Sequence, residues 1–386
     1  MTGSDTSEAP AASAHRRRRR ALAVLLGLAV LAGAGVGTTW ATDTGPFARQ
    51  SFCWGAWHED DGENVPDFLA EDTDGYERTS EQSAPPRKGK RANCSVTLKE
   101  KQDDSATDSA DGYGDGSTTS GSLPADDDPR VAVEVGPVPR DAGERHVWLT
   151  DHLDAGMQPL PHGLPGLMGR ERSLFVLPPK CDTADGRPTV VTVEGTSFPS
   201  GSGSTPDPLM SLVNTAAQQA GCAPEKPFAV TLPLPEPGRG NDLGGWRSPL
   251  CRIPGFRFEL DYDDQYEART GPVTDQLQTC SVDDRTELGN PVTAGQFVMT
   301  SQPRLAALFT GLSHGTPKGK GWRGKGEVGA GQALLTADCH GKPTVFYLRL
   351  DSFLADRAEP DTRRVFAATA NSVADRIGCP AVAPTS

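Results

Sequence analysis

Two histidines occur in matching contexts, and a histidine repeated in this way could act as a general base or as a ligand. His162 opens the string His-Gly-Leu-Pro, and His314 opens the string His-Gly-Thr-Pro. An imidazole titrates near neutral pH, so it can transfer protons or bind a ligand under physiological conditions. The alternative is structural, because a ring in a turn shaped by Gly and Pro can simply hydrogen-bond the backbone. His162 and His314 are therefore the candidate ligand-binding residues.

Other patterns that carry chemistry are weak in this chain. No Ser, Cys or acidic residue stands at a spacing known from nucleophilic triads. Residues 319–324, Gly-Lys-Gly-Trp-Arg-Gly, match the G-x-G-x-x-G string of dinucleotide sites, but no apolar strand precedes them. The alternative is that their basic side chains bind an anionic ligand. The tryptophans are scattered, and we interpret them as packing residues. The sequence thus predicts no catalytic residue, no cofactor and no metal site.

The cysteines predict a covalent framework. All eight follow residue 50, and no close C-x-x-C pair favours zinc over disulfides. In each half, one Cys ends a hairpin strand and another follows a helix, so the helix folding back over the sheet brings the two together. Four cysteines allow three connectivities in each half, and the repeat itself indicates only that both halves share one. Our predicted pairs are Cys181–Cys222, Cys339–Cys379, Cys53–Cys94 and Cys251–Cys280.

Landmarks that recur in the same order indicate a tandem duplication. Gly-Arg-Pro-Thr-Val at 186–190 returns as Gly-Lys-Pro-Thr-Val at 341–345, and in each copy an Asn, Asn214 or Asn371, precedes a Gly-Cys pair by the same offset. We therefore expect two copies of one domain. Further matches are the Ser-Phe pairs at 197–198 and 352–353 and the Cys-Ser-Val strings at 94–96 and 280–282.

Hydrophobic periodicity predicts similar elements in both halves. Each half ends with a hairpin and then a helix that Gly terminates, whereas residues 58–91 lack periodicity and are interpreted as a loop. The fold class is thus α+β, with two tandem antiparallel sheets, each carrying a helix on one face. Predicted strands cover 91–98, 130–138, 173–177, 188–193, 256–260, 278–282, 295–299, 333–335 and 344–350, and predicted helices begin near Asp207, Ser301 and Glu359.

The N-terminus predicts export. Arg16 to Arg20 form a block of cations, and residues 21–41 carry no charge. At about 1.5 Å per residue this segment reaches roughly 31 Å, which spans a bilayer once. Cations stay in the cytoplasm, so the rest of the chain is predicted to be extracytoplasmic on a single-pass membrane protein. The small residues around Thr39-Trp40-Ala41 leave a cleaved signal peptide, and hence secretion, as the alternative.

Composition indicates the domain boundaries, and the net charge indicates which class of partner is disfavoured. The net charge of −13 disfavours nucleic acid, because such a surface repels phosphate. A segment rich in Asp, Ser and Gly cannot bury enough apolar area to fold, so disorder is expected there. The predicted organisation is a basic cytoplasmic tail at 1–20, a transmembrane signal-anchor at 21–41, a first α+β repeat at 42–230 with a disordered acidic insert at 102–128, a Pro/Gly-rich linker at 231–248, and a second α+β repeat at 249–386.

This layout of a basic N-terminus, one spanning segment and a twin Cys-bridged module resembles the membrane-anchored extracytoplasmic proteins of unknown function found in streptomycetes and other actinobacteria. The resemblance implies a place in the cell envelope and transfers no functional residue. Our leading hypothesis is a non-enzymatic binding or interaction protein, a sensor or scaffold with an envelope ligand or protein partner that the sequence does not identify. The alternatives are an envelope hydrolase acting through His162 or His314 and a structural spacer between membrane and wall.

Overall fold

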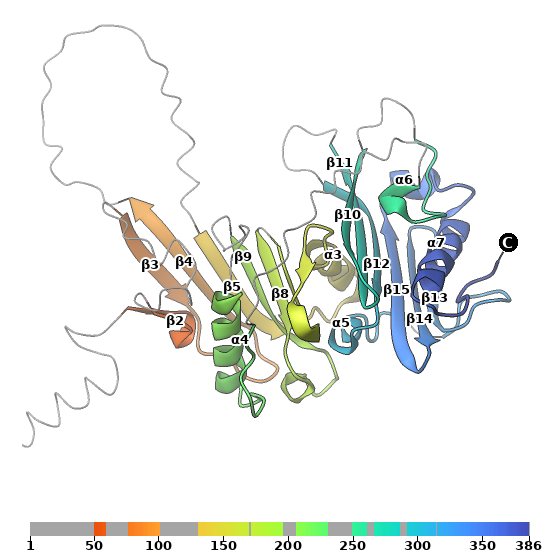
Figure 1. Cartoon of the computed structure of the whole chain (residues 1–386). Helices are drawn as coiled ribbons and strands as arrows, with labels where there is room; N and C mark the ends of the chain where they lie inside the picture. Colours follow the sequence, from red (N-terminus) through yellow and green to blue (C-terminus); the bar gives the residue numbers. More distant parts are fainter. Residues whose placement is uncertain are drawn as a thin grey trace, which may run out of the picture. The chain divides into compact units, whose positions relative to one another are not determined.

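A computed structural model (Figure 1) describes most of the chain beyond residue 49. Among these residues, no helix is both long and apolar enough to cross a bilayer. The predicted tail at 1–20, the signal-anchor at 21–41, the acidic insert at 102–128 and the linker at 231–248 lie outside them and stay predictions. The described ranges are 50–58, 76–100, 130–169, 171–195, 206–230, 249–260, 266–285, 292–313 and 315–385.

The first half forms an antiparallel sheet with the strand order β3-β4-β5-β9-β8-β7-β6. One face of this sheet is buried against helix α4 (Asp207–Gln219). A short hairpin, β1 (Ser51–Phe52) and β2 (Trp57–His58), joins the same core around the 3-10 turn η1 (Cys53–Gly55). The sheet strands are β3 (Tyr76–Gln82), β4 (Ala92–Glu100), β5 (Arg130–Pro137), β6 (Gln158–Pro159), β7 (Gly166–Met168), β8 (Arg172–Val176) and β9 (Thr189–Gly195).

The second half forms a sheet with the order β10-β11-β12-β15-β14-β13, and helix α7 (Thr362–Arg376) packs on one face. Read strand by strand, this order matches that of the first sheet up to β7. The fold is therefore α+β with two antiparallel sheets. The remaining elements are η5 (Leu250–Arg252), β10 (Tyr266–Val273), β11 (Leu277–Asp284), β12 (Val292–Thr300), β13 (Lys325–Val328), β14 (Gln332–Cys339), β15 (Lys342–Leu350) and α6 (Ser352–Asp356).

The two outer helices follow local sequence signals. Pro208 lies in the first turn of α4, and Asp361 caps α7 by accepting a hydrogen bond from the backbone N–H of Arg364 at 2.8 Å. Gly221 and Gly378 then adopt φ of +67° and +73°, the left-handed geometry that ends a helix and suits Gly. Asp207 lies inside the first turn of α4, since Pro206 holds the N-cap position without a side-chain bond.

Four disulfides tie these elements together, in the pairs that the spacing predicts. Cys181–Cys222 and Cys339–Cys379 each join the end of a hairpin to the residue after the outer helix, while the other two bridges join η1 and η5 to the second strand of each sheet. No described cysteine is free. Such a framework is typical of an oxidising, extracytoplasmic environment.

The repeated asparagines have the same structural role in both halves. The amide of Asn214 in α4 donates to Phe228 O and accepts from Phe228 N, both at 2.8 Å. In α7, Asn371 donates to Ala383 O at 3.0 Å and accepts from the N–H groups of Val382 and Ala383 at 2.9 Å. Each amide therefore fixes the segment that follows the helix-terminating disulfide.

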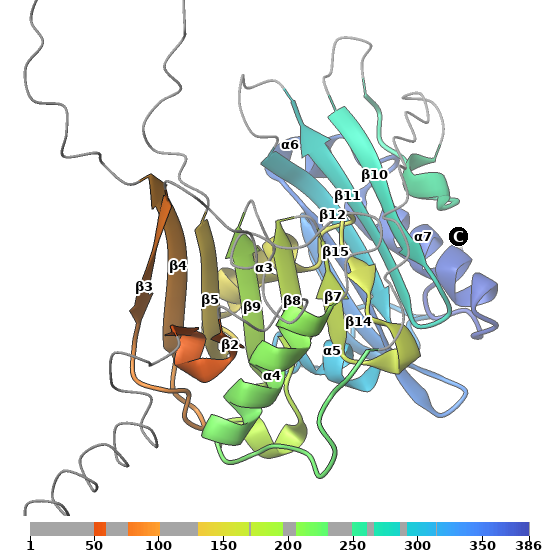
Figure 2. The ribbon, with the colours of Figure 1, turned by 60° about the vertical axis from the view of Figure 1, so that its left-hand side comes forward.

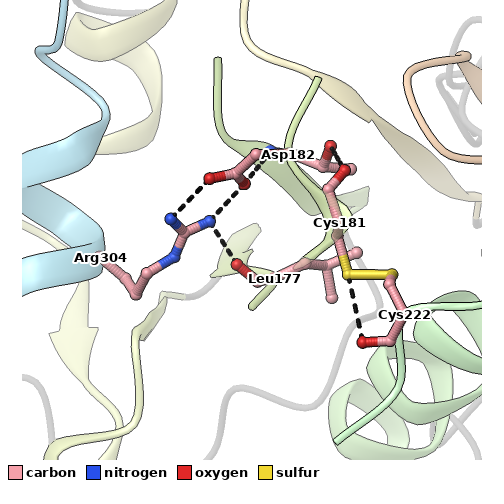
Figure 3. The surroundings of a disulfide bond; sticks show 6 residues. Leu177, Cys181, Asp182, Cys222 and Arg304 are labelled. Carbon is pink, nitrogen blue, oxygen red and sulfur yellow. Dashed lines mark hydrogen bonds and ion pairs between the residues drawn. A yellow bond between two sulfur atoms is a disulfide. The ribbon is translucent and has the colours of Figure 1, made fainter. Parts of the chain in front are cut away.

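A middle layer joins the two sheets within the compact unit Ser51–Ser386. It contains α3 (Ala142–His152) and α5 (Pro303–Ala307), and Figure 1 shows both between the sheets. Apolar side chains from both halves form one continuous core there, including Leu149, Leu305 and Tyr347. In Figure 3, the guanidinium of Arg304 on α5 faces Asp182, beside the Cys181–Cys222 bridge, with N–O distances of 2.9 and 2.6 Å.

Three predictions about the elements need correction. Residues 256–260 form only one isolated bridge, Phe258 to Ala358, and the edge strand is instead β10. The supposed loop at 58–91 contains β3. Helix α3 was not predicted, since the side chains that it buries include Arg145 and His146 and leave little apolar periodicity.

Candidate functional site

The structure describes only one of the two histidines that the sequence favours. His162 lies in a 3-10 turn at φ +58° and is exposed, and it forms no side-chain hydrogen bond or ion pair with another described residue. His314 lies outside the described residues. His162 therefore lacks the nucleophile or carboxylate that the hydrolase alternative requires.

The glycine-rich loop at 319–324 is held by packing. Trp322 stacks on Phe366 of α7 with ring centroids 5.9 Å apart, and the guanidinium of Arg363 lies over the Trp322 ring, 5.1 Å from its centroid. The loop leads into strand β13, whereas a dinucleotide fingerprint opens a helix whose N-terminus binds the pyrophosphate. The loop thus lacks the structural context of a dinucleotide site.

Matching strand registers define two equivalent rows of side chains, each crossing five strands. Ser95 and Ser281 occupy the two Cys-Ser-Val strings, and their cross-strand partners extend each row along its sheet. The first-sheet row consists of Glu81, Ser95, Ala132, Glu194 and Arg172. The second-sheet row consists of Arg269, Ser281, Gln296, Arg349 and Gln332.

The second-sheet row is filled by the chain itself, because α3 and the turn after it lie across all five strands. Gln332 contacts the ring of His146, Arg349 donates to Thr150 Oγ1 at 2.6 Å, and Gln296 donates to Thr150 O and Leu153 O, both at 3.1 Å. The middle of the row is consequently buried: the exposed fractions of Ser281 and Gln296 are 0%.

At the β10 end of the second-sheet row, the turn after α3 is held by an ion pair. Arg269 donates to both carboxylate oxygens of Asp154, at 2.8 and 2.6 Å, and to Asp283 at 2.5 Å. Ser281 accepts a hydrogen bond from Ala155 N at 3.1 Å. Burial by itself would lower the pKa of Arg269, but the hydrogen bonds and charges of Asp283 and Asp154 outweigh it and raise the pKa. Arg269 therefore stays charged and anchors the turn after α3.

The first-sheet row is open. Four of its five residues, all except Arg172, line a cavity of about 550 Å³, which we call the groove, over β3, β4, β5 and β9. Figure 2 shows α3 behind β8 and β9, while β3 to β5 extend past it. Trp148 and His152 of α3 form one wall, with their rings stacked 4.4 Å apart. The side chains lining the groove are Glu81, Gln82, Ser83, Arg91, Asn93, Cys94, Ser95, Arg130, Ala132, Val133, Glu134, Trp148, His152, Thr192 and Glu194.

The wall of the groove presents hydrogen-bond acceptors. Burial lowers the pKa of His152 to about 4, so the ring is neutral at pH 7. Its Nδ1 lies 2.9 Å from Trp148 O, which can only accept, so Nδ1 carries the proton and Nε2 is an acceptor. The carboxylate of Glu194 lies 3.7 Å from Nε2 and is 49% exposed.

The charges on the floor are only partly paired. Arg91 pairs with Glu134, and Arg172 lies 3.6 Å from Glu194. Glu81 and Arg130 form no ion pair with another described residue. As far as the described residues go, the carboxylate of Glu81 on β3 and the guanidinium of Arg130 on β5 are therefore free to contact a ligand.

Comparisons with protein-family models, with curated proteins and with solved structures found no match to this chain. The resemblance to actinobacterial envelope proteins stays a prediction. Function is therefore argued from the geometry of the groove.

Sequence reasoning did not find the groove. The interpretation of Trp148 as a packing residue is confirmed, because it packs against the core between the sheets, but Trp148 also lines the groove. A usable signal was present: Asp141 and Glu144 are spaced as a helix-capping pair, and the Asp141 carboxylate accepts from Glu144 N at 2.9 Å. That signal predicts the start of α3, but only the fold places α3 beside the first-sheet row.

Proposed function

We propose that this protein is a non-enzymatic binding protein of the cell envelope and that the groove is its ligand site. The observation that carries the proposal is the contrast between two equivalent rows: one is filled by α3, and the other lies open beneath Trp148 and His152. An open, polar row on a disulfide-tied sheet is a rigid surface for recognition. Residues 21–41 would hold the protein in the membrane, with 1–20 in the cytoplasm; secretion after cleavage is the alternative.

The chemistry of the groove supports binding more than catalysis. Its side chains supply carboxylates, guanidinium groups, an amide and a tryptophan face, which together suit a polar ligand with apolar parts. No group of three or more His, Cys, Asp or Glu side chains in the described part of the chain is arranged to hold a metal ion. His152 donates the proton on its Nδ1 to Trp148 O and forms no hydrogen bond with a described hydroxyl or thiol.

A duplication explains why one row is filled and the other open. The same strand order, the same two disulfide positions and the same asparagine bridges in both halves support descent from one module. In this proposal, the second copy uses its row to hold the two halves together. The first copy keeps its row for an external ligand.

A thermal-shift screen on the full chain in detergent, with envelope polysaccharides, polyamines and peptides, tests the proposal. A ligand at 100 times its Kd stabilises the folded state by about 2.7 kcal/mol. Trp148→Ala should abolish that stabilisation, because it removes the wall of the groove. Val147→Ala is the matched control, since Val147 is the adjacent residue and is 50% exposed.

Equal ligand shifts in Trp148→Ala and in the wild type would place binding elsewhere and refute the proposal. The absence of any ligand-dependent shift would favour a structural spacer.

A further inference from the structure

The filled second-sheet row shows what kind of object fits such a row. It holds the last turn of a helix and the turn that follows it, residues 146–155. Gln296 donates to two carbonyl groups near the helix end, and Arg269 forms an ion pair with the carboxylate of Asp154. Carbonyl groups at a helix C-terminus have no partner within the helix, so they require such donors from outside.

The first-sheet row carries the opposite charge at the decisive positions. Glu81 stands where the second row has Arg269, and Glu194 stands where it has Arg349. At these two positions the first-sheet row therefore has carboxylates that accept hydrogen bonds, whereas the second-sheet row has guanidinium groups that donate them. The groove also contains hydrogen-bond donors for the carbonyl groups at a helix C-terminus, because Asn93 and Arg130 line it.

From this pairing we infer that the groove receives the C-terminal turn of a helix from a partner protein, with a Lys or Arg at the place that Asp154 takes on the second row. The inference rests on the proposed function and specifies its ligand. Cations are favoured at helix C-termini by the helix dipole, so the predicted cation belongs at that end. It would pair with Glu81, while Trp148 covers the apolar side of the helix.

Two synthetic peptides test this inference. One has the sequence of residues 142–157 of this chain, and the other has the same sequence with Asp154→Lys. Fluorescence anisotropy gives the Kd of each labelled peptide for the full chain in detergent. One exposed ion pair changes affinity by roughly two- to fivefold, and the exchange of Asp for Lys replaces repulsion with attraction. We expect the Lys peptide to bind about fivefold more tightly.

Variants of Glu81 identify the contact. Glu81→Arg should reverse the preference in favour of the Asp peptide, and Glu81→Gln should reduce the preference to less than twofold. Glu77→Arg is the matched control, because Glu77 is exposed four residues earlier on the same strand and does not line the groove. It should keep the wild-type preference.

Failure of both peptides to bind, or an equal preference in wild type and Glu81→Arg, would overturn the inference. If a small ligand is nevertheless found whose binding depends on Trp148, the proposed function stands and only the helical partner is rejected. If no ligand of any kind binds, both are rejected.

Discussion

Arg269→Ala should be strongly destabilising because Arg269 neutralises a buried carboxylate as well as anchoring α3. The side chain of Asp283 is 2% exposed, and that of Asp154 is 21% exposed. Breaking a buried pair by removing one partner typically costs about 3 to 5 kcal/mol, since the other charge is left uncompensated. Asp283 keeps one hydrogen bond, from Thr293 Oγ1 at 3.1 Å, so the expected loss is about 3 kcal/mol, at the lower end of that range.

Asp154→Asn should cost much less. Arg269 keeps its pair with Asp283, and an Asn side chain can still accept hydrogen bonds from Arg269 and from Gly156 N. The expected loss is about 1 kcal/mol, the usual value of one partly exposed charged contact. The double variant Arg269→Ala/Asp283→Asn should be more stable than Arg269→Ala alone, because no unpaired charge stays buried.

Urea unfolding at pH 7 with the disulfides intact, followed by tryptophan fluorescence, measures these free energies of unfolding. Two results would contradict this expectation. One is that Arg269→Ala loses no more stability than Asp154→Asn, and the other is that the double variant Arg269→Ala/Asp283→Asn is no more stable than Arg269→Ala. Either result would mean that Asp283 is neutral or solvated without Arg269.

Three further outcomes are expected. The folded-state pKa of His152 is about 4, below its usual 6.5, so its contribution to stability is complete above pH 6.5 and is lost as the pH falls toward 4; the difference in stability between wild type and His152→Gln should change by about 3 kcal/mol over that range. Replacing Cys181 and Cys222 by Ala should cost about 4 kcal/mol in urea unfolding, since the bridge closes a loop between residues 41 apart. Gly255→Ala should lower stability by about 2 kcal/mol more than Gly186→Ala: both glycines have positive φ, but a Cβ at 255 would lie 2.4 Å from the Ala368 Cβ, and a Cβ at 186 would meet nothing within 4 Å.

Each of these outcomes has its counter-result. A pH-independent difference for His152→Gln would show that the ring is solvated in the folded state. An unchanged urea midpoint without the Cys181–Cys222 bridge would mean that the bridge does not constrain the unfolded chain. Equal losses at Gly255 and Gly186 would show that the segment before Phe256 moves freely away from α7.

Sequence patterns predicted the features that depend on local chemistry. Gly221 and Gly378 marked helix ends because only Gly adopts their φ cheaply. The hairpin-and-helix plan predicted the bridges Cys181–Cys222 and Cys339–Cys379, and the remaining cysteines gave the other two. Alternation predicted β5, whose inward face is apolar throughout.

The functional surface could not be predicted in the same way, because residues distant in sequence form it when α3 packs beside the first sheet. Helix α3 buries His146 and Thr150 against a polar row, so its sequence lacks an apolar stripe. Glu81 and Trp148 are distant in sequence and line one groove only in the folded structure. The equivalence of Glu81 and Arg269 becomes visible only through strand register.

The account depends on the first-sheet row being open while its counterpart is covered, and alkylation of single cysteines measures this most directly. Ala132→Cys and Gln296→Cys place a thiol at equivalent positions, the first half-buried in the groove and the second fully buried under α3. With the disulfides intact, iodoacetamide should modify the cysteine at 132 at least about 100-fold faster than that at 296, because the latter reacts only after the structure opens. Equal protection at both positions would mean that the groove is closed, and the proposed ligand site would have to be abandoned.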